Sequence, residues 1–256
     1  MMRKLVVLSL LAMSLAAPSL HAQPAAAGTA QPAANLVNPG AIQALRDMGA
    51  HLQTLKRFQV STEMTGEVVL GSGQKLQHTA KANMKVVRPN KLRVVMVSAS
   101  SNRELIYDGK TFTLWTPARK YYSTVKFDDT LGGLIDRLEE KYGVQLPMED
   151  LFRWGTPDAP FDKIESAMNA GQAFIDKDLC DHYAFRQGKI DWQIWITTGS
   201  KPLPRKLVIT NRADEARPQS IHLFDWNLKP TFKDSVFNFT APEGATAIEI
   251  LPRKTN

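Results

Sequence analysis

The chain has 256 residues, of which 43% are hydrophobic and 22% charged, and its formal net charge is +7. This length suits one domain of all-β or α+β type with a sizeable core. The basic excess does not indicate nucleic-acid binding, because Lys81, Lys85, Lys91 and Arg93 alternate with apolar residues, as on a solvated sheet face. The net positive charge is compatible with transient contact with an anionic membrane surface. The only cysteine, Cys180, excludes an internal disulfide.

The first 22 residues have the pattern of a secretory signal peptide. Arg3 and Lys4 precede an uncharged apolar stretch over residues 5–17, and residues 20–22 offer a cleavage site. A membrane anchor needs about 20 apolar residues, and Pro18 ends this stretch too early. No cysteine follows immediately after the cleavage site, so the exported product is expected to be soluble and not lipidated.

Residues 23–38 are rich in Ala, Pro, Gln and Gly, which predicts a disordered linker. A single folded domain is expected over residues 39–256. It begins with a predicted amphipathic helix over residues 39–55, because apolar side chains recur there at spacings of three and four.

Strands are predicted at residues 58–70 and 75–87, followed by a run of short strands up to Tyr122. Alternating apolar and polar positions, interrupted by turn residues, are typical of an antiparallel sheet with one apolar face. The Asp108-Gly109 pair tolerates positive φ and permits a tight reversal, which predicts that Leu105 and Tyr107 lie near Phe112 and Leu114.

Two helices are predicted in the middle of the chain, at about residues 130–142 and 148–154, separated by a break at 143–147. Strands then return at 172–179, 181–187, 189–197, 205–211, 219–227 and around 237–239. The predicted fold class is therefore mainly β (α+β), a strongly curved, incomplete antiparallel β-barrel. It has about 10–11 strands by this reading, an N-terminal helix and a helical lid insertion, because a long sheet must cover its apolar face.

The sequence gives little indication of a catalytic site or of a metal-binding site. Cys180 and His182 share a face if they lie on a strand, but two residues along a strand stand roughly 6.5 to 7 Å apart, too far for a direct hydrogen bond. Cys180 is therefore interpreted as a small core residue. The histidines lack ligand spacing, although distant strands could bring His182 and His222 together with Asp225. No catalytic residue, metal or cofactor is predicted.

Methionine and aromatic side chains in the strands and helices have two interpretations, and the sequence does not separate them. Such residues usually fill the core, but flexible methionines also suit a pocket for acyl chains. The candidate ligand-binding residues are Met64, Met84, Met96, Phe112, Leu114, Leu134, Leu138, Phe152, Trp192, Phe224 and Trp226.

Four stretches together resemble the LolA/LolB-like superfamily of periplasmic lipoprotein carriers. They are Val86-Val87-Arg88-Pro89-Asn90, the 107–111 hairpin with the following Trp115-Thr116-Pro117, the segment from 195–197 to 203–207, and the ending at 237–245. The resemblance implies a periplasmic location, an incomplete barrel with a helical lid, and a cavity for acyl chains. It also implies that Arg88 contacts the lid.

Two departures limit what the resemblance implies. The carriers have an aromatic residue soon after the Arg-Pro-Asn turn, where this chain has Lys91-Leu92-Arg93-Val94, and the insertion over residues 130–161 is longer and more charged. The chain is thus more similar to an uncharacterised branch of predicted periplasmic proteins, in which the fold transfers better than the cargo.

The first functional hypothesis is a non-enzymatic periplasmic carrier that shelters a lipid, acyl chain or lipoprotein-like ligand between the curved sheet and its lid. The alternative is an envelope sensor or scaffold that binds another envelope or membrane protein through the curved sheet. The two differ in whether the interior is open or filled by the protein's own side chains. An enzyme is the third hypothesis, with Cys180 and His182 as its best candidates.

Overall fold

The computed structural model describes residues 36–144, 146, 148–157 and 159–253. The predicted signal peptide and residues 23–35 of the predicted linker lie outside the described residues. The elements are α1 (Pro39–Thr54), β1 (Arg57–Val69), β2 (Lys75–Val87), β3 (Lys91–Ser98), β4 (Asn102–Tyr107), β5 (Thr111–Thr116), η1 (Pro117–Arg119), β6 (Tyr121–Lys126), α2 (Leu131–Tyr142), α3 (Asp150–Arg153), η2 (Phe161–Lys163), β7 (Ser166–Ile175), β8 (Asp178–Gln187), β9 (Ile190–Thr197), β10 (Pro204–Asn211), β11 (Gln219–Asn227), η3 (Asp234–Phe237) and β12 (Thr246–Ala247).

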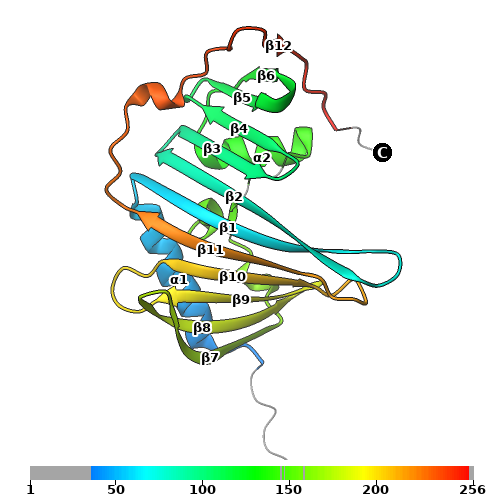
Figure 1. Ribbon diagram of the computed structural model, residues 1–256. Helices are drawn as coiled ribbons and strands as arrows, with labels where there is room; N and C mark the ends of the chain where they lie inside the picture. Colours follow the sequence, from blue (N-terminus) through cyan, green and yellow to red (C-terminus); the bar gives the residue numbers. More distant parts are fainter. Residues whose placement is uncertain (1–35, 145, 147, 158, 254–256) are drawn as a thin grey trace, which may run out of the picture. The chain divides into compact units, whose positions relative to one another are not determined.

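The strands form one curved, unclosed sheet in the order β12-β6-β5-β4-β3-β2-β1-β11-β10-β9-β8-β7 (Figure 1). From β1 the chain moves strand by strand to β6, and it later returns strand by strand from β7 to β11, which pairs with β1. The connection between β6 and β7 must therefore travel from one side of the sheet to the other. This connection contains α2 and α3, which explains why helices lie across one face.

The predicted fold class is confirmed. The sheet has 12 described strands against the expected 10–11, and every pairing is antiparallel except that of β12 with β6. The predicted pairs also form, with Leu105 opposite Leu114 and Tyr107 opposite Phe112. At the turn, Gly109 takes φ +96, while the Asp108 carboxylate accepts hydrogen bonds from the N–H groups of Lys110 and Thr111.

Two predicted strands were misplaced. Gly171 was interpreted as a turn, but it forms a β-bulge within β7, with φ +102 and its N–H donating to the side chain of Asn169. The real turn comes at Asp176, so β7 begins before residue 172 and β8 before residue 181. The strand predicted around residues 237–239 does not form: Phe237, which is fully buried, is the last residue of the 3₁₀ helix η3, and residues 238–239 follow it outside any helix or strand.

One face of the sheet, hereafter the inner face, carries the main hydrophobic core. Phe58, Val60, Met84 and Val94 point to this face and are no more than 1% exposed. Helix α1 contributes Leu45, Met48 and Leu52 to the same core, as its predicted apolar stripe requires. The side chain of Asn38 caps α1 and its N–H donates to the carbonyl of Ala167, so the packing begins just before residue 39.

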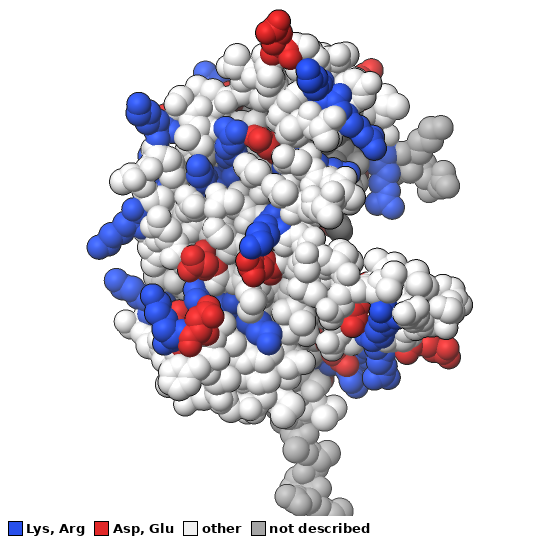
Figure 2. Space-filling model, viewed as in Figure 1, with Lys and Arg blue, Asp and Glu red and all other residues white. Residues whose placement is uncertain are grey.

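The opposite, outer face carries the alternating charges that the sequence predicted. Figure 2 shows Lys and Arg side chains spread over this view of the molecule, with Asp and Glu among them. Lys81 pairs with Glu63 on neighbouring strands at 2.5 Å, and Arg93 pairs with Glu104 at 2.5 Å. None of the helices in the described part of the chain has both the length and the apolarity needed to cross a bilayer.

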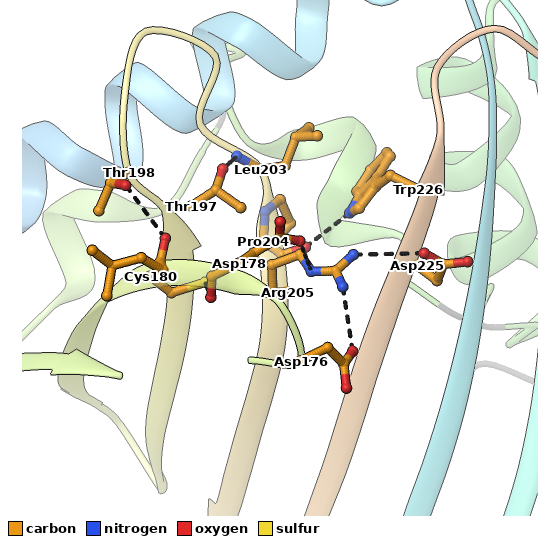
Figure 3. A network of polar contacts seen from close by, with 11 residues as sticks. Asp176, Asp178, Cys180, Thr197, Thr198, Leu203, Pro204, Arg205, Asp225 and Trp226 are labelled. Carbon is orange, nitrogen blue, oxygen red and sulfur yellow. Dashed lines mark hydrogen bonds and ion pairs between the residues drawn. The ribbon is translucent and has the colours of Figure 1, made fainter. Parts of the chain in front are cut away.

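A second, smaller core lies on the outer face, where the end of the β7–β8 hairpin folds over β9 and β10. Cys180, Trp195 and Val208 are buried in it. Arg205, which is only 8% exposed, forms ion pairs with Asp178 at 3.0 Å, Asp176 at 3.4 Å and Asp225 at 3.7 Å (Figure 3). The guanidinium therefore joins the hairpin to β10 and β11.

Candidate functional site

Residues 148–157 and 159–163, hereafter the lid segment, contain α3 and η2 and rest on α1. Contact is made by two glycines: a Cβ at Gly49 would lie 2.4 Å from the backbone nitrogen of Gly155, and Gly155 has φ +82. The side-chain amide of Gln53 donates to the carbonyls of Phe152 (3.2 Å) and Trp154 (2.7 Å). The lid segment thus meets α1 through backbone groups, while its side chains Leu151, Phe152 and Trp154 are buried in the main core.

A second attachment joins the lid segment to α2. The guanidinium of Arg153 pairs with the carboxylates of Glu139 at 2.6 Å and Asp136 at 3.4 Å. Nearby, burial and the charge of Glu139 raise the pKa of Glu149, and its Oε2 is buried without a hydrogen-bond partner among the described residues. Two polar atoms of the lid segment, Glu149 Oε2 and Arg153 Nε, are therefore buried without a hydrogen-bond partner among the described residues.

An apolar hollow of about 310 Å³ lies between the lid segment and strands β8 to β10. Its apolar lining comes from Trp154, Pro160, Phe161, Ile190, Trp192, Leu207 and Ile209, and its polar lining from Asp150, Arg153 and Gln187. The volume is at the lower end of the range for small-molecule sites. The indole nitrogen of Trp192 is buried and has no hydrogen-bond partner in the described structure.

A second hollow, of about 520 Å³, lies beside Arg88 and is hereafter the Arg88 hollow. It is lined by Gln53, Lys56, Arg88, Pro89, Thr130, Leu131, Gly132, Phe152 and Thr156. The guanidinium carbon of Arg88 lies 5.3 Å from the ring centroid of Phe152 in the lid segment. Burial lowers the pKa of Arg88 below its usual range.

A third hollow, of about 380 Å³, shares Thr156 with the Arg88 hollow and Phe161 with the apolar hollow. It is bordered by Arg46 and Ala50 of α1. All three hollows therefore border the lid segment, which is the loosely packed part of the inner face.

Under α2, by contrast, the inner face is closely packed. The space between this helix and the sheet, bordered by Phe112, Leu134 and Leu138, measures about 10 Å³, too little for a ligand. Met84, Phe224 and Phe152 are no more than 4% exposed, and Met64, Met96, Leu114 and Trp226 pack against the same core.

The structure thus brings all eleven predicted ligand-binding residues into one hydrophobic core but gives them different surroundings. Trp192 borders the apolar hollow and Phe152 borders the Arg88 hollow. Phe224 borders a separate hollow whose other lining side chains come mainly from the outer face. The remaining members are core side chains that a ligand reaches only if the core opens.

The sequence analysis missed Gly49, Gln53, Lys56 and Gly155. Only Gly49 has a local signal, because a glycine within a helix is unfavourable and needs a packing reason. The contact between Gly49 and Gly155 joins residues that are far apart in the sequence, so no local pattern could identify it.

Cys180 and His182 both lie near Trp195 on the outer face, but each has its own hydrogen-bond partner. Cys180 is fully buried, and burial followed by the charge of Asp178 raises the pKa of its thiol to about 11. His182 stacks on Trp195 at 4.0 Å and shares a hydrogen bond of 3.0 Å with Gln193. Within the described residues, no three side chains of His, Cys, Asp or Glu gather as metal ligands would.

Comparison with known proteins gives a family and several similar structures. Residues 41–251 match the family model described as a predicted periplasmic protein (DUF2092), and no curated protein matches significantly. Similar solved structures include an uncharacterized conserved protein from Thermus thermophilus (10% identity, 82% of this chain and 99% of that chain, TM-score 0.46). Others are LprF from Mycobacterium bovis (14%, 82% and 99%, 0.45) and a LolA superfamily protein from Nitrosomonas europaea (12%, 78% and 97%, 0.38).

Proposed function

The chain belongs to the DUF2092 family of predicted periplasmic proteins, as its resemblance led us to expect, and we propose that it is a non-enzymatic periplasmic binding or carrier protein. Its ligand is a lipid, an acyl chain or a similar apolar group, and the binding site is the apolar hollow beneath the lid segment. Export by the signal peptide at residues 1–22, without lipid attachment, is part of the same proposal.

The apolar hollow is the observation that carries this proposal. Its lining is mainly aromatic and aliphatic, and it adjoins the main core. Its cover is the lid segment, whose side chains Leu151, Phe152 and Trp154 are buried in that core. Each buried CH₂ contributes about 0.8 kcal/mol, so about ten methylenes would give a dissociation constant near the micromolar range before the costs of association.

Binding in this proposal proceeds by displacement of the lid segment from α1. Release of the two hydrogen bonds from Gln53 and of the contact between Gly49 and Gly155 enlarges the apolar hollow toward the core. Arg88 contacts the closed lid through Phe152, which supports the lid-contact role expected for it. Core residues such as Met84 and Phe112 would meet a ligand only in this open state.

The test is ligand binding by the mature protein purified from the periplasm. Organic extracts analysed by mass spectrometry are expected to contain lipid, and the neutral fluorophore N-phenylnaphthylamine is expected to bind. Ile209→Trp should fill the apolar hollow and weaken this binding at least about fivefold, roughly 1 kcal/mol. Val68→Trp, at a position that is 51% exposed on β1, is the matched control and should leave binding unchanged. Absence of both extracted lipid and fluorophore binding would refute the proposal.

A second candidate function, protein binding through the curved sheet, is favoured by a hollow on the outer face. This hollow measures about 500 Å³ and includes Val95, Val97 and Leu223, of which Val97 is 46% and Leu223 41% exposed. A photo-crosslinking residue at position 97 should give a defined adduct with an envelope protein in cells, and the same residue at position 119 should not. Equal labelling from both positions would exclude this candidate.

A further inference from the structure

The Arg88 hollow has the composition of an anion site. Two of its lining residues, Arg88 and Lys56, carry positive charge, and Gln53, Thr130 and Thr156 supply neutral polar groups. No carboxylate is among the residues that line it. The carboxylate of Asp129 lies at the start of α2 beside Gly133 and accepts a hydrogen bond from the Thr130 N–H, but Asp129 is not among the residues that line this space.

The guanidinium of Arg88 has donors that the described residues leave unused. Its Nε and Nη2 atoms are buried and have no hydrogen-bond partner, and its contact is the apolar ring of Phe152. The backbone N–H of Arg88 donates to the backbone carbonyl of Lys56. The two positively charged residues are therefore neighbours in the wall of the hollow. A buried cation without a counter-ion is costly, and an anion that accepts its hydrogen bonds would remove that cost.

Helix α2 adds to the same polarity. Its 12 residues begin at the hollow, which Thr130, Leu131 and Gly132 border. The Leu131 N–H donates to the carbonyl of Pro89 and the Gly133 N–H to the Thr130 hydroxyl, so within this first turn the helix dipole is only a secondary contribution beside Arg88. Guanidinium groups and helix N-termini are both recurrent partners of phosphate oxygens. The unpartnered guanidinium of Arg88, with Lys56 beside it, is what distinguishes the hollow from an ordinary helix start.

We propose that the Arg88 hollow binds a phosphate group, with Arg88 as its main ligand and Lys56 as a second positive charge. The hollow borders α3 through Phe152, and the apolar hollow borders it through Asp150 and Arg153. If the phosphate is the headgroup of an amphiphile, its chain extends into the apolar hollow, and in that form the inference rests on the proposed function. A free phosphate ion would use the same donors.

The test compares three probes by isothermal titration calorimetry with the mature protein. They are dihexanoylphosphatidylglycerol, which has a phosphate, dihexanoylglycerol, which has the same chains without it, and inorganic phosphate. The phosphate-bearing lipid is expected to bind at least about tenfold more tightly than the neutral lipid, which corresponds to about 1.4 kcal/mol. Arg88→Gln should abolish this preference, so that the two lipids bind equally, and Lys56→Gln should reduce it.

Arg88→Lys keeps the charge and should retain part of the preference, which separates loss of the anion site from loss of folding. Arg119→Gln removes the same charge from an exposed site in η1 and is the matched control. Binding of inorganic phosphate that needs Arg88 supports a free ion as ligand, and binding of the phosphate lipid alone supports a headgroup.

Equal binding of the two lipids, or a preference that persists in Arg88→Gln, overturns the inference and leaves the proposed carrier function intact. If the neutral lipid does not bind while phosphate binding still depends on Arg88, the anion site stands and the proposed function fails.

Discussion

Replacing Gly49 by alanine tests whether the lid segment docks on α1 through backbone contact. The new Cβ would lie 2.4 Å from the nitrogen of Gly155, 2.7 Å from its Cα and 2.8 Å from the carbonyl carbon of Trp154. All three are backbone atoms, so no side chain can rotate away and the lid segment must move.

The magnitude follows from the overpacking at this contact. Overpacking costs about 1–3 kcal/mol, and the rigid backbone contact favours the upper end of this range. Alanine in place of glycine within a helix gains about 1 kcal/mol, but α1 is helical whether the lid segment is docked or displaced, so this gain offsets the loss of overall stability and not the loss of docking. Docking of the lid segment is therefore expected to weaken by about 2–3 kcal/mol, which corresponds to about 30- to 150-fold faster exchange of its amides when exchange follows the opening equilibrium.

Hydrogen exchange measured by mass spectrometry gives the direct readout, because the Trp154 N–H bonds to Asp150 and the Thr156 N–H to Arg153 within the lid segment. Peptides from the sheet should keep wild-type protection. Gly132→Ala is the matched control, since its nearest neighbour would lie at an ordinary 3.8 Å. Unchanged lid exchange together with a higher melting temperature, as for an unconstrained helical glycine, would refute the reasoning.

Gln53→Glu should also weaken the docking of the lid segment, because a carboxylate cannot donate hydrogen bonds to the carbonyls of Phe152 and Trp154. Amide exchange should become faster in the lid segment alone, and exchange at the wild-type rate would contradict this prediction. Glu149 has a raised pKa in the folded protein, so its contribution to stability is present below its ordinary pKa and is lost as pH rises through the raised value. Glu149→Gln should therefore raise the melting temperature at pH 7 and change it little at pH 4, and a pH-independent difference would argue against this origin. The pKa of the Cys180 thiol is raised from 9.0 to about 11, so the contribution of this thiol to stability is present below about pH 9 and is lost as pH rises through about 11. The thiol of the folded protein should therefore resist alkylation by iodoacetamide at pH 8. Labelling as fast as that of the protein unfolded in urea would contradict its burial. Arg205→Met should destabilise the protein by about 1–2 kcal/mol because it leaves Asp178 unpaired, whereas Asp176→Asn, at an 83% exposed partner, should cost at most about 0.5 kcal/mol in thermal or urea unfolding.

The sequence by itself determined the parts of the fold that depend on local patterns. The apolar stripe of α1, the alternation along β1 to β6 and the Asp108-Gly109 turn are set by neighbouring residues, and the structure agrees with them. Local sequence patterns gave wrong element boundaries where the same residue type is compatible with two backbone structures. Gly171 has positive φ in a bulge as readily as in a turn, and the Phe237 region packs its aromatic side chains without forming a strand.

Only the tertiary structure decided where hollows remain between the sheet and the segments that cover its inner face. The side chain of each predicted ligand-binding residue could serve equally well in a closely packed core or in the wall of a pocket. Which of the two applies depends on how closely a helix from a distant part of the sequence packs against it. Helix α2 fills the face above Phe112, Leu134 and Leu138, whereas the lid segment leaves hollows beside Trp192 and Arg88. That difference arises from the path between β6 and β7 and from the approach of Gly49 to Gly155, which are separated by about a hundred residues and have no local signature as a pair.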